Sequence, residues 1–364
     1  MNPATITLER IKLYAARNER ALDAGFFVGG FLFDILTLGR IDHWLTIAQH
    51  ATYLTVSSLI LVQMLLAQGQ PQPDAASLPR LRRWYLQYRT PALHFLLGAL
   101  LSAYTVFFFK SSSLLVSFGF MAVLVGLLFV NESARFKALG LPFKFALLGL
   151  CWLAYFAYVI PVLIGQTGLV VFLVSIAAGC IPLSLVALRI PQEKRRVISI
   201  PLGCVVIGFL TFYLFRLIPP VPLSIPFMGV YHGVERSDLG YKLTHERPAW
   251  RFWQNGDQEF RAQPGDKVHV YFRIFSPSRF SDQVQMKWYL YKSEAGRWSL
   301  QDTIPIKIVG GREEGFRGYG VKSRYDPGEW KVQVETSDGR EIGRIYFTLE
   351  TVPDSPRSFA AELD

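Results

Sequence analysis

The chain contains 364 residues, of which 51% are hydrophobic, and it carries a formal net charge of +10. Residues 231–364 hold 20 basic and 20 acidic side chains, so the whole positive excess lies in residues 1–230. An excess confined to the apolar part of a chain is typical of loops that orient membrane helices. We therefore interpret the basic pI as a topology signal, and we expect the lipid bilayer, not nucleic acid, to be a partner.

After a predicted cytoplasmic segment over residues 1–20, seven apolar stretches follow one another to residue 218. Each has close to or more than the ~20 residues that an α-helix needs to cross a ~30 Å hydrocarbon core. They predict a seven-helix transmembrane domain over 21–218, with spans at 21–39, 43–67, 91–109, 112–130, 143–164, 168–188 and 197–218.

Positive charge alternates between the loops. Basic clusters precede the first span and follow the second, fourth and sixth, whereas the other loops carry little beyond Arg40 and Lys110. Because short basic loops stay on the cytoplasmic side, the N-terminus is predicted to be cytoplasmic and everything after Ile218 extracytoplasmic.

Residues 219–226 contain four prolines and are predicted to form a semi-rigid linker. All three cysteines lie in predicted spans, which leaves the C-terminal region without a disulfide framework or a cysteine metal site.

From residue 227 the apolar pattern changes to a period of two, which is typical of strands. Val268, Val270, Phe272 and Ile274 form one such set, and the set of Val284 to Leu290 forms another. Further strands are expected at 298–309, 316–323, 329–336 and 342–349, and Asp338-Gly339 is a strong hairpin signal. The expected fold is an all-β, immunoglobulin- or fibronectin-like sandwich over 227–351, followed by a flexible tail over 352–364.

The residues of this region also carry a resemblance. The motifs that carry it are Pro264-Gly265-Asp266, Trp288, the turn at 310–312, Lys322-Ser323 and the strand at 328–332. Through these motifs, residues 217–350 resemble the C-terminal β-module of an uncharacterised bacterial envelope family. The resemblance implies a bacterial inner-membrane protein with a periplasmic β-domain. It implies no catalytic residues.

Polar residues in the predicted spans are candidates for chemistry, because ionisable groups in a membrane are costly. Asp34, Gln49 and His50 are expected at similar depth on the first two helices. A carboxylate beside an imidazole there would relay a proton or gate a path. Alternatively, Asp34 makes a hydrogen bond between packed helices.

The usual enzyme signatures, such as a Gly-x-Ser-x-Gly elbow, His-Glu-x-x-His or a Walker A loop, are missing from the sequence. His232, His245 and His269 are far apart in the chain, and a single histidine on a strand is more often a surface polar group than a ligand. We therefore predict no cofactor and no metal, and we favour a role other than catalysis.

Strand parity predicts an outward aromatic and basic face made of Tyr271, Arg273, Tyr289, Tyr291 and Tyr346. Such side chains are common at recognition surfaces. Alternatively, residues 227–262 or the helical bundle cover this face. A second candidate is an anion site made of Arg312, Arg317, Lys322 and Arg324.

The function that we predict is recognition or scaffolding of an envelope glycan or protein by the sandwich, with the helical bundle as an anchor or signal relay. The alternative is a transporter or membrane-enzyme component that uses Asp34 and His50, with the sandwich as an accessory domain. The sequence does not indicate the oligomeric state.

Overall fold

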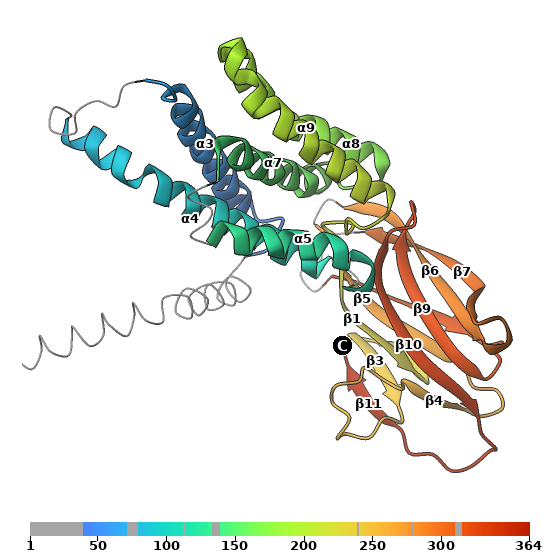
Figure 1. Cartoon of the computed structure of the whole chain (residues 1–364). Helices are drawn as coiled ribbons and strands as arrows, with labels where there is room; N and C mark the ends of the chain where they lie inside the picture. The colour runs from blue at the N-terminus through green and yellow to red at the C-terminus, as the bar shows by residue number, and fades with distance from the viewer. Residues whose placement is uncertain are drawn as a thin grey trace, which may run out of the picture. The chain divides into compact units, whose positions relative to one another are not determined.

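The computed structural model describes residues 39–70, 79–111, 114–132, 139–238, 240–277, 280–309 and 315–364 (Figure 1). The chain forms two compact units. The first comprises residues 1–106, 122–155 and 180–206, and the second comprises residues 107–121, 156–179 and 207–364.

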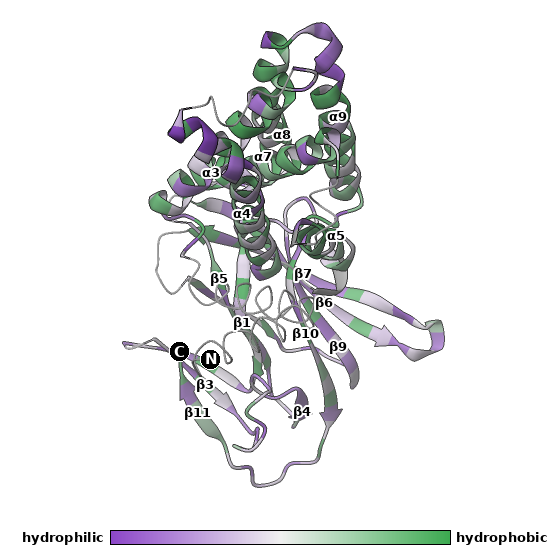
Figure 2. Ribbon diagram, turned by 60° about the vertical axis from the view of Figure 1, so that its left-hand side comes forward, coloured by the Kyte–Doolittle hydropathy of each residue, from purple (hydrophilic) through white to green (hydrophobic). Residues whose placement is uncertain are grey.

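The described helices are α3 (Trp44–Leu66), α4 (Arg80–Lys110), α5 (Leu114–Glu132), α7 (Leu141–Ile164), α8 (Leu169–Arg189) and α9 (Gln192–Leu214). Each described helix overlaps one predicted span, although α4 begins eleven residues before the span predicted at 91–109. Figure 2 shows that hydrophobic residues dominate the helices. All except α5 are long and apolar enough to cross a membrane, which indicates a membrane association.

The predicted number of seven spans is not confirmed. Within the described residues five helices meet the requirements for a span, and the apolar part of α5, Ser117–Asn131, is shorter. The predicted span at 21–39 lies outside the described residues apart from Gly39.

Polar contacts join helices within the first unit. The indole N–H of Trp152 on α7 donates to Ser58 Oγ on α3 at 3.1 Å. The ammonium of Lys194 on α9 donates to the carbonyls of Leu65 and Gln68 at 3.0 Å each. Lys194 thereby provides a donor to backbone carbonyls at and just beyond the end of α3.

The second unit contains eleven strands in its described residues. They are β1 (Ser224–Tyr231), β2 (Gly233–Ser237), β3 (Gly240–His245), β4 (Glu259–Ala262), β5 (Val268–Phe275), β6 (Ser281–Lys292), β7 (Arg297–Val309), β8 (Phe316–Lys322), β9 (Gly328–Thr336), β10 (Glu341–Thr351) and β11 (Ala360–Leu363). Every strand that the alternation predicted from residue 268 onward is present.

The strands form three sheets. One has the order β1-β5-β8, a five-stranded sheet has the order β4-β10-β9-β6-β7, and a small sheet has the order β11-β3-β2. Strand β4 runs parallel to β10, and the other pairs are antiparallel. The predicted turn at Asp338-Gly339 connects β9 to β10, with Gly339 at a φ of 78°.

The main core lies between the β1-β5-β8 sheet and the five-stranded sheet. Trp288, Trp330 and Phe347 pack there, with ring centroids 6.4 Å apart, against the buried side chains of β5. Both apolar sets that the alternation picked out, Val268 to Ile274 and Val284 to Leu290, face this core. The two layers make a β-sandwich, as predicted.

A smaller core lies on the other face of β1 and β5. It contains Tyr231, Val234, Leu243 and Tyr271, so the β2-β3 hairpin packs on the sheet face opposite the main core. The sequence did not predict this third sheet.

The linker and tail predictions are wrong. Strand β1 begins at Ser224, inside the predicted linker, and Pro219, Pro220 and Pro222 are buried in the second unit. The N–H of Leu223 donates to the carbonyl of Pro220 at 3.0 Å, so the prolines that end the seventh predicted span form a packed turn. In the predicted flexible tail, residues 360–363 form β11, which pairs with β3.

The turn between β9 and β10 contains a hydrogen-bonded cluster with Tyr213, a residue of the same unit. Arg340 is buried and donates to Asp338 at 2.7 Å and to the Tyr213 hydroxyl at 3.0 Å. Tyr213 also donates to Asp338 at 3.0 Å. Burial raises the pKa of Asp338, but the charge of Arg340 and these hydrogen bonds outweigh it, so the pKa lies below its ordinary value.

Candidate ligand-binding pocket

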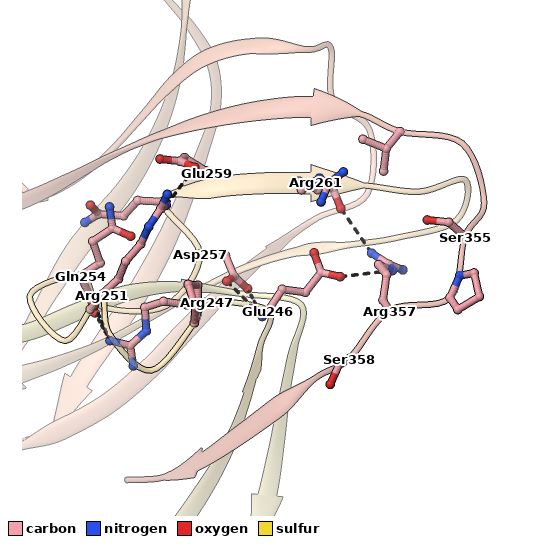
Figure 3. A pocket seen from close by; sticks show the side chains of 14 residues that line it. Glu246, Arg247, Arg251, Gln254, Asp257, Glu259, Arg261, Ser355, Arg357 and Ser358 are labelled. Carbon is pink, nitrogen blue, oxygen red and sulfur yellow. Dashed lines mark hydrogen bonds and ion pairs between the residues drawn. The ribbon is translucent and has the colours of Figure 1, made fainter.

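A pocket of about 350 Å³ opens beside β4, between the segment that leads into β4 and the segment that follows β10. Figure 3 shows the side chains that line it. The lining residues from Glu246 to Gln258 come from the first segment, Glu259 and Arg261 from β4, and those from Val352 to Ser358 from the second segment. Because Ala360 of β11 pairs with His245 of β3, the end of the second segment lies beside the start of the first.

Four arginines and three carboxylates line the pocket. Arg251 pairs with Glu259 at 2.9 Å, and Arg357 lies 3.6 Å from Glu246. Arg247 donates to the backbone carbonyl of Gln254 at 2.6 Å and thereby holds the loop. The fourth arginine, Arg261, is exposed and has no ion pair among those of the described residues. Among the side chains that line the pocket, arginines therefore outnumber carboxylates by one.

Behind the pocket lies a buried imidazole. His232 Nε2 is 3.7 Å from Glu246 and 3.7 Å from Asp257, and its Nδ1 is 3.8 Å from Asp266. The ring stacks on Phe260 with centroids 4.0 Å apart. Arg357 donates to both oxygens of Asp266, at 2.7 and 3.1 Å.

Burial governs the protonation of this cluster. Desolvation lowers the pKa of His232 to about 4 and raises the pKa of Asp257 to about 6, although the carboxylate of Asp257 accepts the N–H of Glu246. Burial acts to raise the pKa of Asp266 as well, but its hydrogen bonds with Arg357 and Gln263 outweigh this and the pKa is lowered. The pair His232 and Asp257 therefore holds one proton around pH 5.

Three exposed aromatic side chains lie in the loop that carries the pocket residues. Trp250, Phe252 and Trp253 have 61%, 81% and 61% of their surface exposed. Trp253 contacts both other rings, with centroids 5.6 Å from Trp250 and 5.3 Å from Phe252. The guanidinium of Arg251 lies 4.9 Å from the Trp250 ring centroid. Exposed aromatic groups next to a polar pocket are typical of a recognition site.

No group of three or more metal-ligating side chains is present among the residues that the structure describes. The predicted absence of a metal and a cofactor stays a prediction.

The predicted outward face divides between two sheets. Tyr289, Tyr291 and Tyr346 lie on the outer face of the five-stranded sheet, where Tyr346 pairs with Lys331 across the strands and Tyr291 pairs with Trp298. The ammonium of Lys331 lies 4.3 Å from the Tyr289 ring centroid and 5.2 Å from that of Trp298.

The prediction that Tyr271 is on an open face is wrong, and Arg273 is half-buried with it. Tyr271 does point away from the main core, as parity required, but the β2-β3 hairpin covers that face and Tyr241 packs 5.5 Å from the Tyr271 ring. The alternative that residues 227–262 cover the face therefore holds for these two residues.

The predicted anion site does not assemble from its described members. Arg317 and Lys322 lie at opposite ends of β8, where Arg317 faces Asp364 and Lys322 pairs with Asp302. Arg324 is exposed beyond the strand, and Arg312 lies outside the described residues.

Of the predicted intramembrane polar residues, Asp34 also lies outside the described residues. Gln49 is exposed on α3 and donates to the Tyr53 hydroxyl at 3.0 Å. His50 is buried, with its ring 5.5 Å from the Tyr104 ring. Gln49 and His50 therefore point to different sides of the helix.

Sequence reasoning missed the pocket. The side chains of His232 and His245 are only 6% and 8% exposed, contrary to the interpretation of these histidines as surface polar groups. The cluster joins residues 232, 246, 257 and 266, whose spacing follows no motif. The available signal was Trp250, Phe252 and Trp253, which belong to the segment 227–262 that was predicted only as cover for another face.

Comparison with known proteins adds a partial family match. Residues 281–349, which run from β6 to β10, match a family described as a protein of unknown function (DUF2914). This supports a C-terminal β-domain of unknown function. No curated protein matches the chain.

Three solved structures show low similarity. An immunoglobulin-like protein from Pseudomonas aeruginosa is 13% identical, with 36% of this chain and 98% of that chain covered and a TM-score of 0.22. A β-glucosidase from Listeria innocua in complex with glucose is 17% identical, with 26% and 15% covered and a TM-score of 0.20. The Pseudomonas fluorescens alkylpurine DNA glycosylase AlkC, bound to DNA containing an abasic site analog, is 11% identical, with 86% and 99% covered and a TM-score of 0.23. At these TM-scores none of them supports an inference about function.

Proposed function

We propose that this protein is a polytopic bacterial inner-membrane protein with seven spans and a periplasmic, immunoglobulin-like sandwich that binds an envelope glycan. The N-terminus is cytoplasmic in this proposal, and the helices anchor the sandwich or relay its occupancy. The observation that supports glycan binding best is the exposed cluster of Trp250, Phe252 and Trp253 in the loop that lines the arginine-rich pocket.

The chemistry of the pocket fits a sugar. Aromatic rings offer flat apolar area to the C–H faces of a pyranose ring, and arginine and carboxylate groups offer donors and acceptors to its hydroxyls. The exposed guanidinium of Arg261 adds an uncompensated positive charge. We therefore expect the glycan to carry carboxylate or phosphate groups.

The outer face with Tyr289, Tyr291, Trp298 and Tyr346 is the second candidate surface for the same function. Its side chains are half-buried except Tyr346, which is 42% exposed, and the ammonium of Lys331 lies over the Tyr289 ring. A flat face of this kind fits an extended polysaccharide or a protein, whereas the pocket fits a short charged segment.

The test is titration of the full chain in detergent with a panel of neutral and anionic envelope glycans. We expect saturable binding of an anionic glycan. Trp253→Ala should weaken it at least about tenfold, since the loss of a central aromatic contact generally costs more than about 1.4 kcal/mol. Tyr319→Ala is the matched control, because Tyr319 is an exposed aromatic residue on β8.

The same titration separates the two surfaces. Binding lost in Tyr289→Ala but kept in Trp253→Ala would move the site to the outer face. A chain that stays folded and binds no glycan in the panel would refute the proposal, and the intramembrane residues Asp34 and His50 would then be the next to test.

A further inference from the structure

Strand β11 is held mainly through its backbone and two carboxylates. It pairs antiparallel with the edge of β3, with Ala360 opposite His245 and Leu363 opposite Lys242. The N–H of Asp364 donates to the carbonyl of Tyr241 at 3.0 Å, and the N–H of Tyr241 donates to the carbonyl of Asp364 at 2.9 Å. The pairing of β11 buries little apolar surface, since the side chains of Ala360, Ala361 and Leu363 are exposed.

The protein presents a built site to each carboxylate. The buried Tyr271 hydroxyl donates to Asp364 at 2.5 Å, and the guanidinium groups of Arg273 and Arg317 lie 3.2 and 3.5 Å from the same carboxylate. Two residues earlier, Glu362 accepts a hydrogen bond of 2.6 Å from the buried Tyr231 hydroxyl and lies 3.4 Å from Arg247. A period of two residues places both carboxylates on the same side of the strand.

The backbone of β3 is shaped for a close neighbour. Gly240 has a φ of 143°, and a Cβ at this position would lie 2.2 Å from the carbonyl oxygen of Asp364. A pocket of about 410 Å³, lined by Arg236, Gly240, Tyr241 and Arg317, borders this position. The site therefore has room for further residues of a ligand next to the aspartate.

We propose that the edge of β3 is a binding site for an extended acidic peptide with carboxylate side chains two residues apart, and that residues 360–364 occupy it as a displaceable internal ligand. Addition of a strand to a sheet edge takes its affinity from backbone hydrogen bonds and its specificity from pockets for alternate side chains. Here the two arginine and tyrosine subsites supply that specificity. The partner is a protein segment of the pattern Glu-x-Asp. This proposal does not rest on the proposed glycan function, although Arg247 lines the pocket and also contacts Glu362.

The probe for the test is a fluorescent peptide with the sequence of residues 359–364. It is titrated into the otherwise intact chain truncated after Phe359, in detergent, and into the unaltered chain. We expect saturable binding to the truncated chain. The unaltered chain should bind on the order of 100-fold more weakly, because a tethered competitor acts at an effective concentration near the millimolar range.

Variant peptides test the recognition of the carboxylates. Glu362→Gln with Asp364→Asn in the peptide should weaken its binding at least about tenfold, because hydrogen bonds to charged groups are about twice as strong as neutral ones. Leu363→Ala is the matched control, since this side chain is 58% exposed. Equal binding of the amide and carboxylate peptides would overturn the proposed specificity.

A second protein variant covers the case in which truncation unfolds the domain. The full chain with Glu362→Gln and Asp364→Asn keeps β11 but weakens its hold, so it should bind the peptide more tightly than the unaltered chain does. If this variant and the folded truncated chain both bind no peptide, β11 is a permanent strand and the proposal is refuted.

Discussion

The titrations of His232 and Asp257 should cancel in the pH dependence of the free energy of unfolding. In the folded protein the pKa of His232 is about 4 and that of Asp257 about 6, against ordinary values of 6.5 and 3.8. Between about pH 4 and 6 the folded pair therefore holds one proton, on the carboxyl group. The unfolded chain also holds one proton there, on the imidazole. Because the numbers of bound protons are equal, the pair contributes almost no slope of stability with pH in this window.

When one partner is replaced, the titration of the other should change the free energy of unfolding with pH. In Asp257→Asn only His232 titrates. The pKa of His232 is lower in the folded state than in the unfolded state. Its contribution to the free energy of unfolding is therefore fully present above pH 6.5 and is lost as the pH falls toward 4. Each pKa unit is worth about 1.4 kcal/mol, which gives a loss of about 3 kcal/mol over the window.

His232→Gln should show the opposite sign. Of the pair, only Asp257 then titrates, and its pKa is higher in the folded state than in the unfolded state. Its contribution to the free energy of unfolding is therefore fully present below pH 3.8 and is lost as the pH rises through 6. The expected loss is again about 3 kcal/mol. An asparagine at 257 keeps an oxygen that accepts the N–H of Glu246, so the loop geometry survives the first variant.

The assay is urea unfolding of the full chain in detergent between pH 4 and 7.5, followed by the fluorescence of the buried Trp288 and Trp330. The quantity compared is the free energy of unfolding of each variant minus that of the unaltered chain at the same pH. The exposed Asp354 supplies the control variant Asp354→Asn, which should give a constant difference. If the Asp257→Asn and His232→Gln differences are also constant across the window, the reasoning about this pair is refuted.

Two further predictions concern the backbone and the β9-β10 turn. Gly256→Ala should destabilise the sandwich by several kcal/mol, because Gly256 has a φ of 69° and a Cβ there would lie 1.9 Å from the carbonyl oxygen of Val230. Gly265 has a φ of 90° and open space around it. Gly265→Ala should therefore lower the free energy of unfolding in the same urea assay by only about 1–2 kcal/mol. Arg340→Met should cost on the order of 2–3 kcal/mol by leaving Asp338 without its ion pair, less than for a wholly buried pair because the Asp338 side chain is 26% exposed. Equal losses for the two glycine variants, or an unchanged midpoint for Arg340→Met, would contradict these assignments.

Patterns with a local physical cause were readable from the sequence. The strands from β5 to β10 follow from alternation, because side chains of a strand point to opposite faces in turn. The hairpin at Asp338-Gly339 follows from the positive φ that glycine supports. The apolar helices follow from the length of hydrophobic sequence that a bilayer requires. Alternation along β10 likewise puts Tyr346 on the side opposite to Ile345 and Phe347, which lie in the core.

The tertiary structure alone decided what covers each face and which distant residues meet. Alternation indicates that Tyr271 and Val270 point to opposite sides of a sheet, but the β2-β3 hairpin determines that both sides are buried. The 360–364 segment is short and has only one large apolar side chain, Leu363, and the open edge of β3 makes it a strand. His232 and Asp257 are 3.7 Å apart because the segment before β4 bonds to the end of β1, where the N–H of Asp257 donates to the carbonyl of Val230 at 2.7 Å. This contact is non-local and leaves no periodicity in the sequence.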